Sequence, residues 1–204
     1  MAFSLIEANE TLRLALLLKE ELEKSGLKVY LTRDDHEDVV DLYGVDGRLY
    51  QAYQVQAKYY IELNMMYSSN EAIRGSTAHY SRYASNRFAT LVFKSYLDNT
   101  TLVPRGTSTN GNLDGVKAAP SYEGYDAIPV IRESGGRILG AGTMSEASME
   151  NAIFNKDARI GMQSLSLDLI YISNQEDVDY FTQNLETLSL NLSQGIIDYL
   201  RINP

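Results

Sequence analysis

Hydrophobic and polar positions along the chain alternate in ways that predict an ordered series of helices and strands. Leucines crowd residues 7–25 and Gly26 follows them, which predicts a buried helix closed by a left-handed glycine. Residues 27–33 then alternate apolar and polar side chains, as a half-buried strand does. Further helices are predicted at 47–57, 81–96 and 175 to about 200, and further strands at 76–80, 127–131 and 164–172.

The most apolar short run lies at residues 59–66, where only Glu62 and Asn64 interrupt Tyr, Ile, Leu and Met side chains. A run of this length and bulk is typical of a strand buried on both faces inside a parallel sheet. Asn64 lies near its carboxyl end, which is where ligands bind in open α/β sheets. Because a predicted helix separates this run from residues 27–33, we expect the two strands to be parallel in one sheet.

The order of these elements predicts an α/β fold, with a mostly parallel, twisted sheet and helices on both faces. A single domain over residues 1–204 is the simplest organisation for a chain of this length. The strand at 76–80 is predicted to lie at an edge of the sheet. Two polar, glycine-rich stretches, at about 97–126 and 135–158, are predicted to be long insertions that carry partner contacts.

The composition of the chain limits the chemistry available to it. A net charge of −9 disfavours binding to nucleic-acid phosphates. The absence of cysteine excludes disulfides and thiolate metal sites, and the only histidines are His36 and His79. No apolar run is long enough to span a membrane, and residues 1–6 do not read as a signal peptide.

Four segments of the chain carry motifs that occur together, in this order, in one known family. They are Glu7-Ala8-Asn9 with the strand that ends in Leu31-Thr32-Arg33, then Lys58 to Asn64 preceded by Arg48, then Gly75 to Tyr80, and finally Leu167 to Asn174 with Glu176-Asp177. Together they resemble the zinc-dependent N-acetylmuramoyl-L-alanine amidases, which cut peptidoglycan. The resemblance implies an amidase-like α/β fold that lacks the family's first strand, since none is predicted before Glu7.

The resemblance also implies a zinc ion held by two histidines and a glutamate, with another glutamate as general base. Glu7 falls on the metal-binding glutamate and Asn64 falls on the second histidine. Asp168 falls on the general base and is one methylene shorter, and Tyr171 matches an aromatic that follows it. The first histidine belongs on the strand that has no counterpart here. Glu62, next to Asn64 on the same strand, is expected in the same cleft.

Glu7 and Asn64, the residues at the implied ligand positions, do not form a good zinc site. A hydrolytic zinc site uses about three nitrogen or oxygen ligands, and a neutral amide does not replace imidazole. Without the metal, the pKa of the water is not lowered to ~7. We therefore expect no zinc or other cofactor. Structural roles remain open for every position: Glu7 as a first-turn carboxylate, Asn64 as a hydrogen-bonder, Asp168 as a partnered strand carboxylate, and His36 and His79 as surface histidines.

Three hypotheses for function follow. The first is a catalytically degenerate amidase-like domain that binds peptidoglycan or has a structural role in a cell-wall or phage-related assembly, at the wall or on a virion. The second is an active zinc amidase whose missing ligands come from outside this chain. The third, a small-molecule or nucleotide-binding domain, is disfavoured because no phosphate-binding glycine turn follows a strand. An open sheet edge is expected, covered by another protein chain or an insertion.

Overall fold

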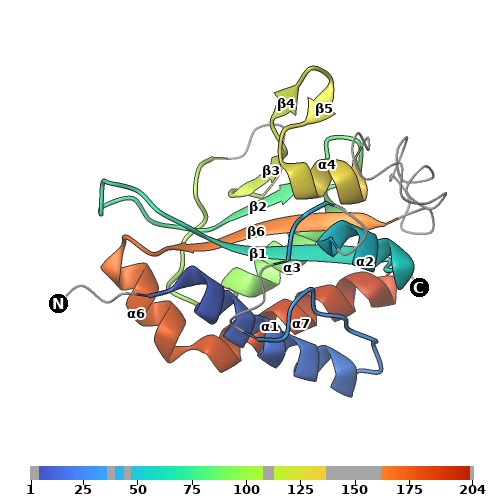
Figure 1. Ribbon diagram of the computed structural model, residues 1–204. Helices are drawn as coiled ribbons and strands as arrows, with labels where there is room; N and C mark the ends of the chain where they lie inside the picture. The colour runs from blue at the N-terminus through green and yellow to red at the C-terminus, as the bar shows by residue number, and fades with distance from the viewer. Residues whose placement is uncertain (1–4, 36–39, 44–46, 108–112, 137–161, 203–204) are drawn as a thin grey trace.

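The computed structural model describes residues 5–35, 40–43, 47–107, 113–136 and 162–202. Within these ranges a four-stranded sheet lies between two layers of helices (Figure 1). Across the sheet the order is β1 (Tyr59–Met66), β6 (Gln163–Tyr171), β2 (Thr77–Tyr80) and β3 (Val116–Ala118). β1 is parallel to β6 and β2 is parallel to β3, whereas β2 is antiparallel to β6. The sheet is therefore mixed, and the predicted α/β class with helices on both faces is confirmed.

The helices form a thick layer on one face of the sheet and a thin layer on the other. The thick layer consists of α1 (Glu7–Lys24), α3 (Arg87–Leu97), α6 (Gln175–Gln183) and α7 (Leu185–Ile202), and the thin layer of α2 (Arg48–Gln54) and α4 (Pro129–Gly135) (Figure 1). The main core lies under the thick layer, with Leu14, Phe88, Phe93, Leu167 and Leu188 among its buried members. A smaller cluster, which includes Leu49, Tyr60 and Val130, packs beneath α2 and α4. In the described ranges, no helix is long and apolar enough to cross a membrane.

The helix ends that were predicted from short sequence motifs agree with the structure. α1 buries leucines at helical spacing and stops where Gly26 adopts a φ of 83°. The Asn174 side chain accepts a hydrogen bond from the Asp177 N–H and caps α6, as its sequence position predicted. The helical stretch that follows is broken at Asn184 into α6 and α7, and the helix predicted to begin at residue 81 begins at Arg87.

Two predicted strands, at 27–33 and 127–131, are wrong, and two others, β1 and β2, take different places in the sheet. Residues 27–33 are extended but belong to no strand in the described part of the chain, so β1 is an edge strand instead of an interior one. Conversely β2, predicted at an edge, lies between β6 and β3. Residues 127–131 were expected to be a strand, but Pro129 stands in the first turn of α4, where its missing N–H costs nothing.

The region predicted as a long irregular insertion at 97–126 contains regular structure. It holds β3 and a hairpin of β4 (Ser121–Tyr122) and β5 (Tyr125–Asp126). The two turn residues, Glu123 and Gly124, both have positive φ, as a two-residue hairpin turn requires. Nearly all of the other predicted insertion, 135–158, lies outside the described residues, as does His36.

Candidate functional site

A strip of polar side chains crosses the face of the sheet that carries α2 and α4. β1 contributes Glu62 and Asn64, β6 contributes Ser166 and Asp168, and β2 contributes His79. The strand register explains this, because Asn64 pairs with Asp168, and Ser166 lies between Glu62 and His79. Alternate residues of a strand share a face, so these positions are brought together although they are far apart in the sequence. This polar strip is the candidate site.

Asn64 is held in a closed hydrogen-bond network within the strip. Its Nδ2 donates to Glu62 Oε2 at 3.2 Å and to Ser166 Oγ at 3.0 Å. Ser166 Oγ in turn donates to the same Glu62 oxygen at 2.8 Å. Because a carboxylate only accepts, the Asn64 amide must present its NH₂ group here. Tyr60, on the same face, adds no charge, since burial raises the pKa of Tyr60 to about 12.

Removing the Ser166 hydroxyl tests this network. Ser166 is 2% exposed, so Ser166→Ala is expected to lower the free energy of unfolding by about 1–2 kcal/mol, as buried hydrogen bonds are lost. Ser121→Ala, at an exposed hairpin position, is the matched control and is expected to change it by less than about 0.5 kcal/mol. Urea denaturation of both variants measures the difference, and equal effects would contradict a buried network.

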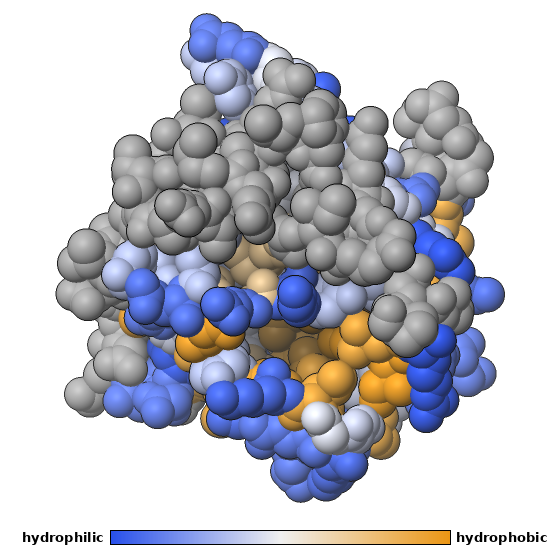
Figure 2. All heavy atoms as spheres, turned by 90° about the vertical axis from the view of Figure 1, so that its right-hand side faces the viewer, coloured by the Kyte–Doolittle hydropathy of each residue, from blue (hydrophilic) through white to orange (hydrophobic). Residues whose placement is uncertain are grey.

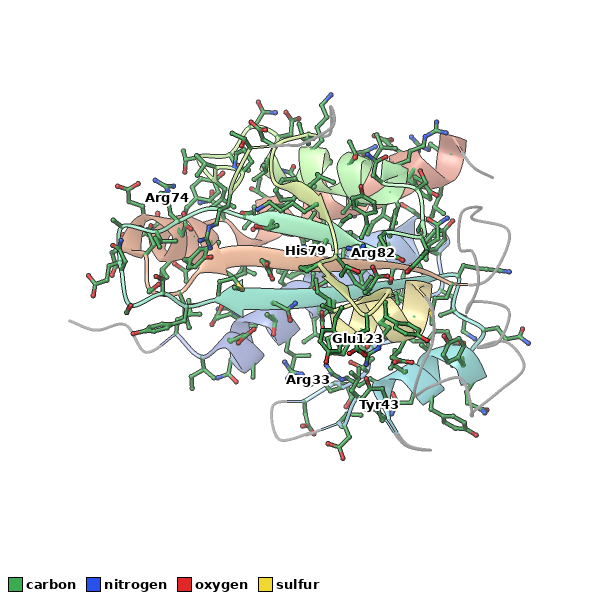
Figure 3. The ribbon with its side chains drawn as sticks, turned by 90° about the horizontal axis from the view of Figure 1, so that it is seen from above. Arg33, Tyr43, Arg74, His79, Arg82 and Glu123 are labelled. Atoms are coloured by element: carbon green, nitrogen blue, oxygen red, sulfur yellow. The ribbon has the colours of Figure 1, made fainter. Side chains whose placement is uncertain are left out.

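Asp168 has a partner that the sequence did not reveal. Its Oδ2 lies 3.4 Å from Nε2 of His79, and the two side chains are 15% and 17% exposed. The other ring nitrogen of His79, Nδ1, is buried without a hydrogen-bond partner in the part of the chain that the structure describes. Seen from above, His79 lies over the middle of the sheet (Figure 3). His79, expected as a surface histidine, is therefore partly buried beside a carboxylate.

Glu7 reaches the sheet from the first turn of α1. Its Oε1 accepts a hydrogen bond of 2.8 Å from the Met65 N–H. Glu7, Glu62 and Asn64 line one cavity of about 720 Å³, beside residues of α2 and the extended segment that ends at Arg33. Asp168 is not among the residues that line this cavity.

Tyr171, expected in the cleft, lies elsewhere. It is 3% exposed, and the Arg105 guanidinium lies 4.6 Å from its ring centroid, a cation–π contact. It is not among the residues that line the Glu7 cavity. Its surroundings are those of a packed core side chain covered by an arginine.

The donor set of the site does not suit zinc. The described residues contain no group of three or more His, Cys, Asp and Glu side chains arranged to hold a metal ion. The NH₂ group of Asn64 is bonded to its neighbours, so this residue has only a neutral amide oxygen left, and Glu7 has Oε2 left because Oε1 accepts the Met65 N–H. A zinc site of the hydrolytic type needs about three such donors free to converge. The described residues therefore do not supply the ligand set of the metal that the motif resemblance implies.

Comparison with known proteins gives a family match and several similar folds. The family model described as N-acetylmuramoyl-L-alanine amidase matches residues 1–198. Comparison with curated proteins gives no match. The catalytic domain of CwlV, an N-acetylmuramoyl-L-alanine amidase from Bacillus (Paenibacillus) polymyxa var. colistinus, is 21% identical, with a TM-score of 0.68 over 98% of this chain and 87% of that one.

Two further amidase structures are similar at lower identity. AmiC2 of Nostoc punctiforme is 16% identical, with a TM-score of 0.65, and the match covers 98% of this chain and 87% of that chain. CwlD of Clostridioides difficile, solved in complex with the GerS lipoprotein, is 16% identical, with a TM-score of 0.62 and coverage of 98% and 88%. At these identities the structural likeness establishes a shared fold.

Proposed function

Because this chain belongs to the N-acetylmuramoyl-L-alanine amidase family, we propose that it keeps the amidase fold without zinc hydrolysis of the muramic acid–L-alanine amide. In this proposal residues 1–204 form one amidase-like domain. It acts as a peptidoglycan-binding or structural module of a cell-wall or phage-related assembly, at the wall or on a virion. The observation that supports it best is that Asn64 stands where the resemblance places a histidine ligand and has its NH₂ group bonded to Glu62 and Ser166.

The physical reason lies in what each of these groups can offer a metal. The NH₂ group of Asn64 is bonded to Glu62 and Ser166, so the amide has only its neutral Oδ1 to offer a metal, and a neutral amide oxygen does not replace imidazole. Glu7 Oε1 accepts the Met65 N–H, which leaves Oε2 as the oxygen that the Glu7 carboxylate could offer a metal. Bound zinc supplies a water of lowered pKa in such sites. Without it, Asp168 has no activated water from which to take a proton, and it lies beside His79 instead.

A second function is favoured by one observation. Glu7, Glu62 and Asn64 line a common cavity of about 720 Å³, which lies within the range of about 300–1,000 Å³ for small-ligand pockets. An active zinc amidase remains the alternative if ligands from outside this chain complete the site. In that case Glu7 would be a metal ligand and Asp168 the general base.

Zinc titration and a wall-lysis assay distinguish the two functions. Calorimetric titration of the full chain with zinc is expected to show no stoichiometric binding at submicromolar concentrations. The turbidity of purified cell walls is expected to stay constant, because neither Lewis acid nor activated water is present. Sedimentation with the same walls is expected to carry the protein into the pellet if the module binds peptidoglycan.

The matched variants are Glu7→Ala and Glu10→Ala. Both remove a carboxylate from the first turn of α1, but Glu10 pairs with Arg13 within the same helix, whereas Glu7 reaches the Met65 N–H of β1. Stoichiometric zinc binding with lysis that Glu7→Ala abolishes and Glu10→Ala preserves would establish the active amidase. Absence of wall binding together with absence of lysis would leave only the structural role.

A further inference from the structure

A groove runs between β1 and the extended residues 27–31. In that extended segment Leu27, Val29 and Leu31 are partly buried, whereas Lys28 and Tyr30 are exposed. This alternation is that of a strand with one buried face. Yet the segment is paired with no strand among the described residues, and both it and β1 line the cavity between them.

The segment is anchored at both ends. At its start the Leu27 N–H donates to the Leu22 carbonyl at 3.2 Å, next to the left-handed Gly26. Beyond its end, the Arg33 guanidinium donates to the Ala8 carbonyl of α1. The segment is therefore held beside the sheet as a separate wall, with a gap where a neighbouring strand would lie.

The opposite wall is the free edge of β1. β1 pairs only with β6 in the described sheet, and the Gln163 N–H donates to the Lys58 carbonyl at 2.8 Å. Backbone groups of alternate residues point to the same side of a strand. Those of Lys58, Tyr60 and Glu62 therefore point toward β6, and those of the residues between them point into the groove.

Some outward N–H groups on this edge have no partner in the described part of the chain. Met65 belongs to this outward set, and its N–H donates to Glu7 Oε1 at 2.8 Å. This bond confirms that the N–H groups of the set point away from β6, and it leaves the Met65 N–H unavailable to another strand. The outward N–H groups of Ile61 and Leu63 have no partner among the residues that the structure describes. Unpaired edge groups are a template for another strand.

The gap between the walls is large and apolar. It has a volume of about 1200 Å³, above the range of about 300–1,000 Å³ that is usual for small-molecule pockets. Its lining includes side chains of α1 and α7, namely Ala15, Leu18, Leu22, Ile196 and Leu200. Figure 2, which views the side of the molecule with α2 and the end of α7, shows a hydrophobic hollow ringed by hydrophilic residues. Its size and its hydrogen-bonding wall suit a peptide.

The charge around the groove differs from that of the whole chain. Lys19, Lys28 and Lys58 line it, and no described aspartate or glutamate does, although the net charge of the protein is −9. Glu7 and Glu62 line the adjoining cavity of about 720 Å³, which shares Ile61 and Leu63 with the groove. A bound segment with acidic residues at its ends would meet these lysines.

We propose that this groove binds an extended peptide segment of a partner protein, which adds to β1 as a strand. The segment hydrogen-bonds the outward edge of residues 59–63, about 17 Å of strand at about 3.3 Å per residue. Its alternate apolar side chains enter the hollow, and its acidic flank faces Lys28 and Lys58. The proposal is independent of whether the domain hydrolyses peptidoglycan.

A synthetic peptide tests this proposal on the full chain. The probe is fluorescein-labelled Asp-Val-Thr-Ile-Thr-Val-Thr-Ile-Asp, and the control replaces its central Thr by Pro, which removes one backbone donor. Fluorescence anisotropy is expected to show saturable binding of the probe and binding at least about tenfold weaker for the proline peptide. Hydrogen exchange followed by NMR is expected to slow at least about tenfold at the Ile61 and Leu63 amides when the probe is bound.

A charge reversal provides variants that do not disturb the core. Lys28→Glu combined with Lys58→Glu is expected to weaken binding of the probe about tenfold, and a probe with lysine ends is expected to recover it. Lys94→Glu on α3, outside the groove, is the control and should bind as the unchanged protein does. Both proteins can be checked for folding by circular dichroism.

The following results would overturn the proposal. The first is no binding of the probe at millimolar concentration, and the second is binding that neither the proline nor the charge reversal changes. Protection of the Ile61 and Leu63 amides by concentration-dependent dimerisation would assign the groove to a second copy of this chain. Their protection by purified muropeptides, with no effect of the probe, would assign it to peptidoglycan.

Discussion

Asp177→Ala is expected to lower the free energy of unfolding by about 3–5 kcal/mol, because it removes a buried carboxylate that accepts several hydrogen bonds. The side chain of Asp177 is fully buried in the first turn of α6. Its Oδ1 accepts from Arg74 Nε at 3.1 Å, and its Oδ2 accepts from the N–H groups of Gly75 at 2.9 Å and Tyr171 at 3.3 Å. Without the carboxylate, two backbone donors and part of a guanidinium lose their acceptor. Guanidinium chloride denaturation measures the loss.

Glu176→Ala is the matched control for this prediction. Glu176 pairs with the same arginine, but its side chain is 74% exposed. An exposed ion pair contributes little, so the control is expected to cost less than about 1 kcal/mol. Equal losses in the two variants would show that the Arg74 ion pair, and not the buried backbone contacts, determines the effect.

Phe88→Ala is also expected to lower the free energy of unfolding by about 3–5 kcal/mol, the usual cost of removing a buried aromatic ring. Phe88 is 2% exposed on α3, and its ring centroid lies 4.9 Å from that of Tyr199 on α7 and 5.1 Å from that of Tyr59 on β1. The ring therefore joins both helices to the free edge of the sheet. Thermal and urea denaturation check the prediction.

Phe88→Leu distinguishes the contribution of buried side-chain volume from that of the aromatic contacts. It keeps most of the buried volume, so we expect a loss of about 1–2 kcal/mol, well below that of alanine. Hydrogen exchange at the Ile61 amide should rise in the alanine variant, because Tyr59 loses the ring against which it packs. If alanine and leucine had the same cost, the aromatic cluster would not be what stabilises this layer.

Elements with strong local signals could be predicted from the sequence. The leucine spacing of α1, its stop at Gly26, and the Asn174 cap of α6 depend on interactions within a few residues. The apolar runs of β1 and β6 identify strands for the same reason. The motif resemblance identified the family, which the match over residues 1–198 bears out.

The candidate site could be predicted only in part. The resemblance pointed to Glu7 and Asn64, which line one cavity together with Glu62. It gave no reason to expect Ser166 or His79 in the polar strip. The alternation of Ser164, Ser166 and Asp168 along the last strand was the available signal for a polar face, but the pairing with His79 depends on the antiparallel register of β2 and β6.

The sequence by itself determined the family and the helical and apolar segments, because these depend on residue identity and short-range spacing. It also shows an amide, Asn64, where the resemblance places a histidine ligand, and the shorter Asp168 where it places the general base. Only the tertiary structure decided which strands are neighbours. The alternation in residues 27–33 would suit a paired strand equally well, but pairing requires another backbone within hydrogen-bond reach, and β1 lies across an open groove. For the same reason β1, apolar enough for a sheet interior, lies at an edge.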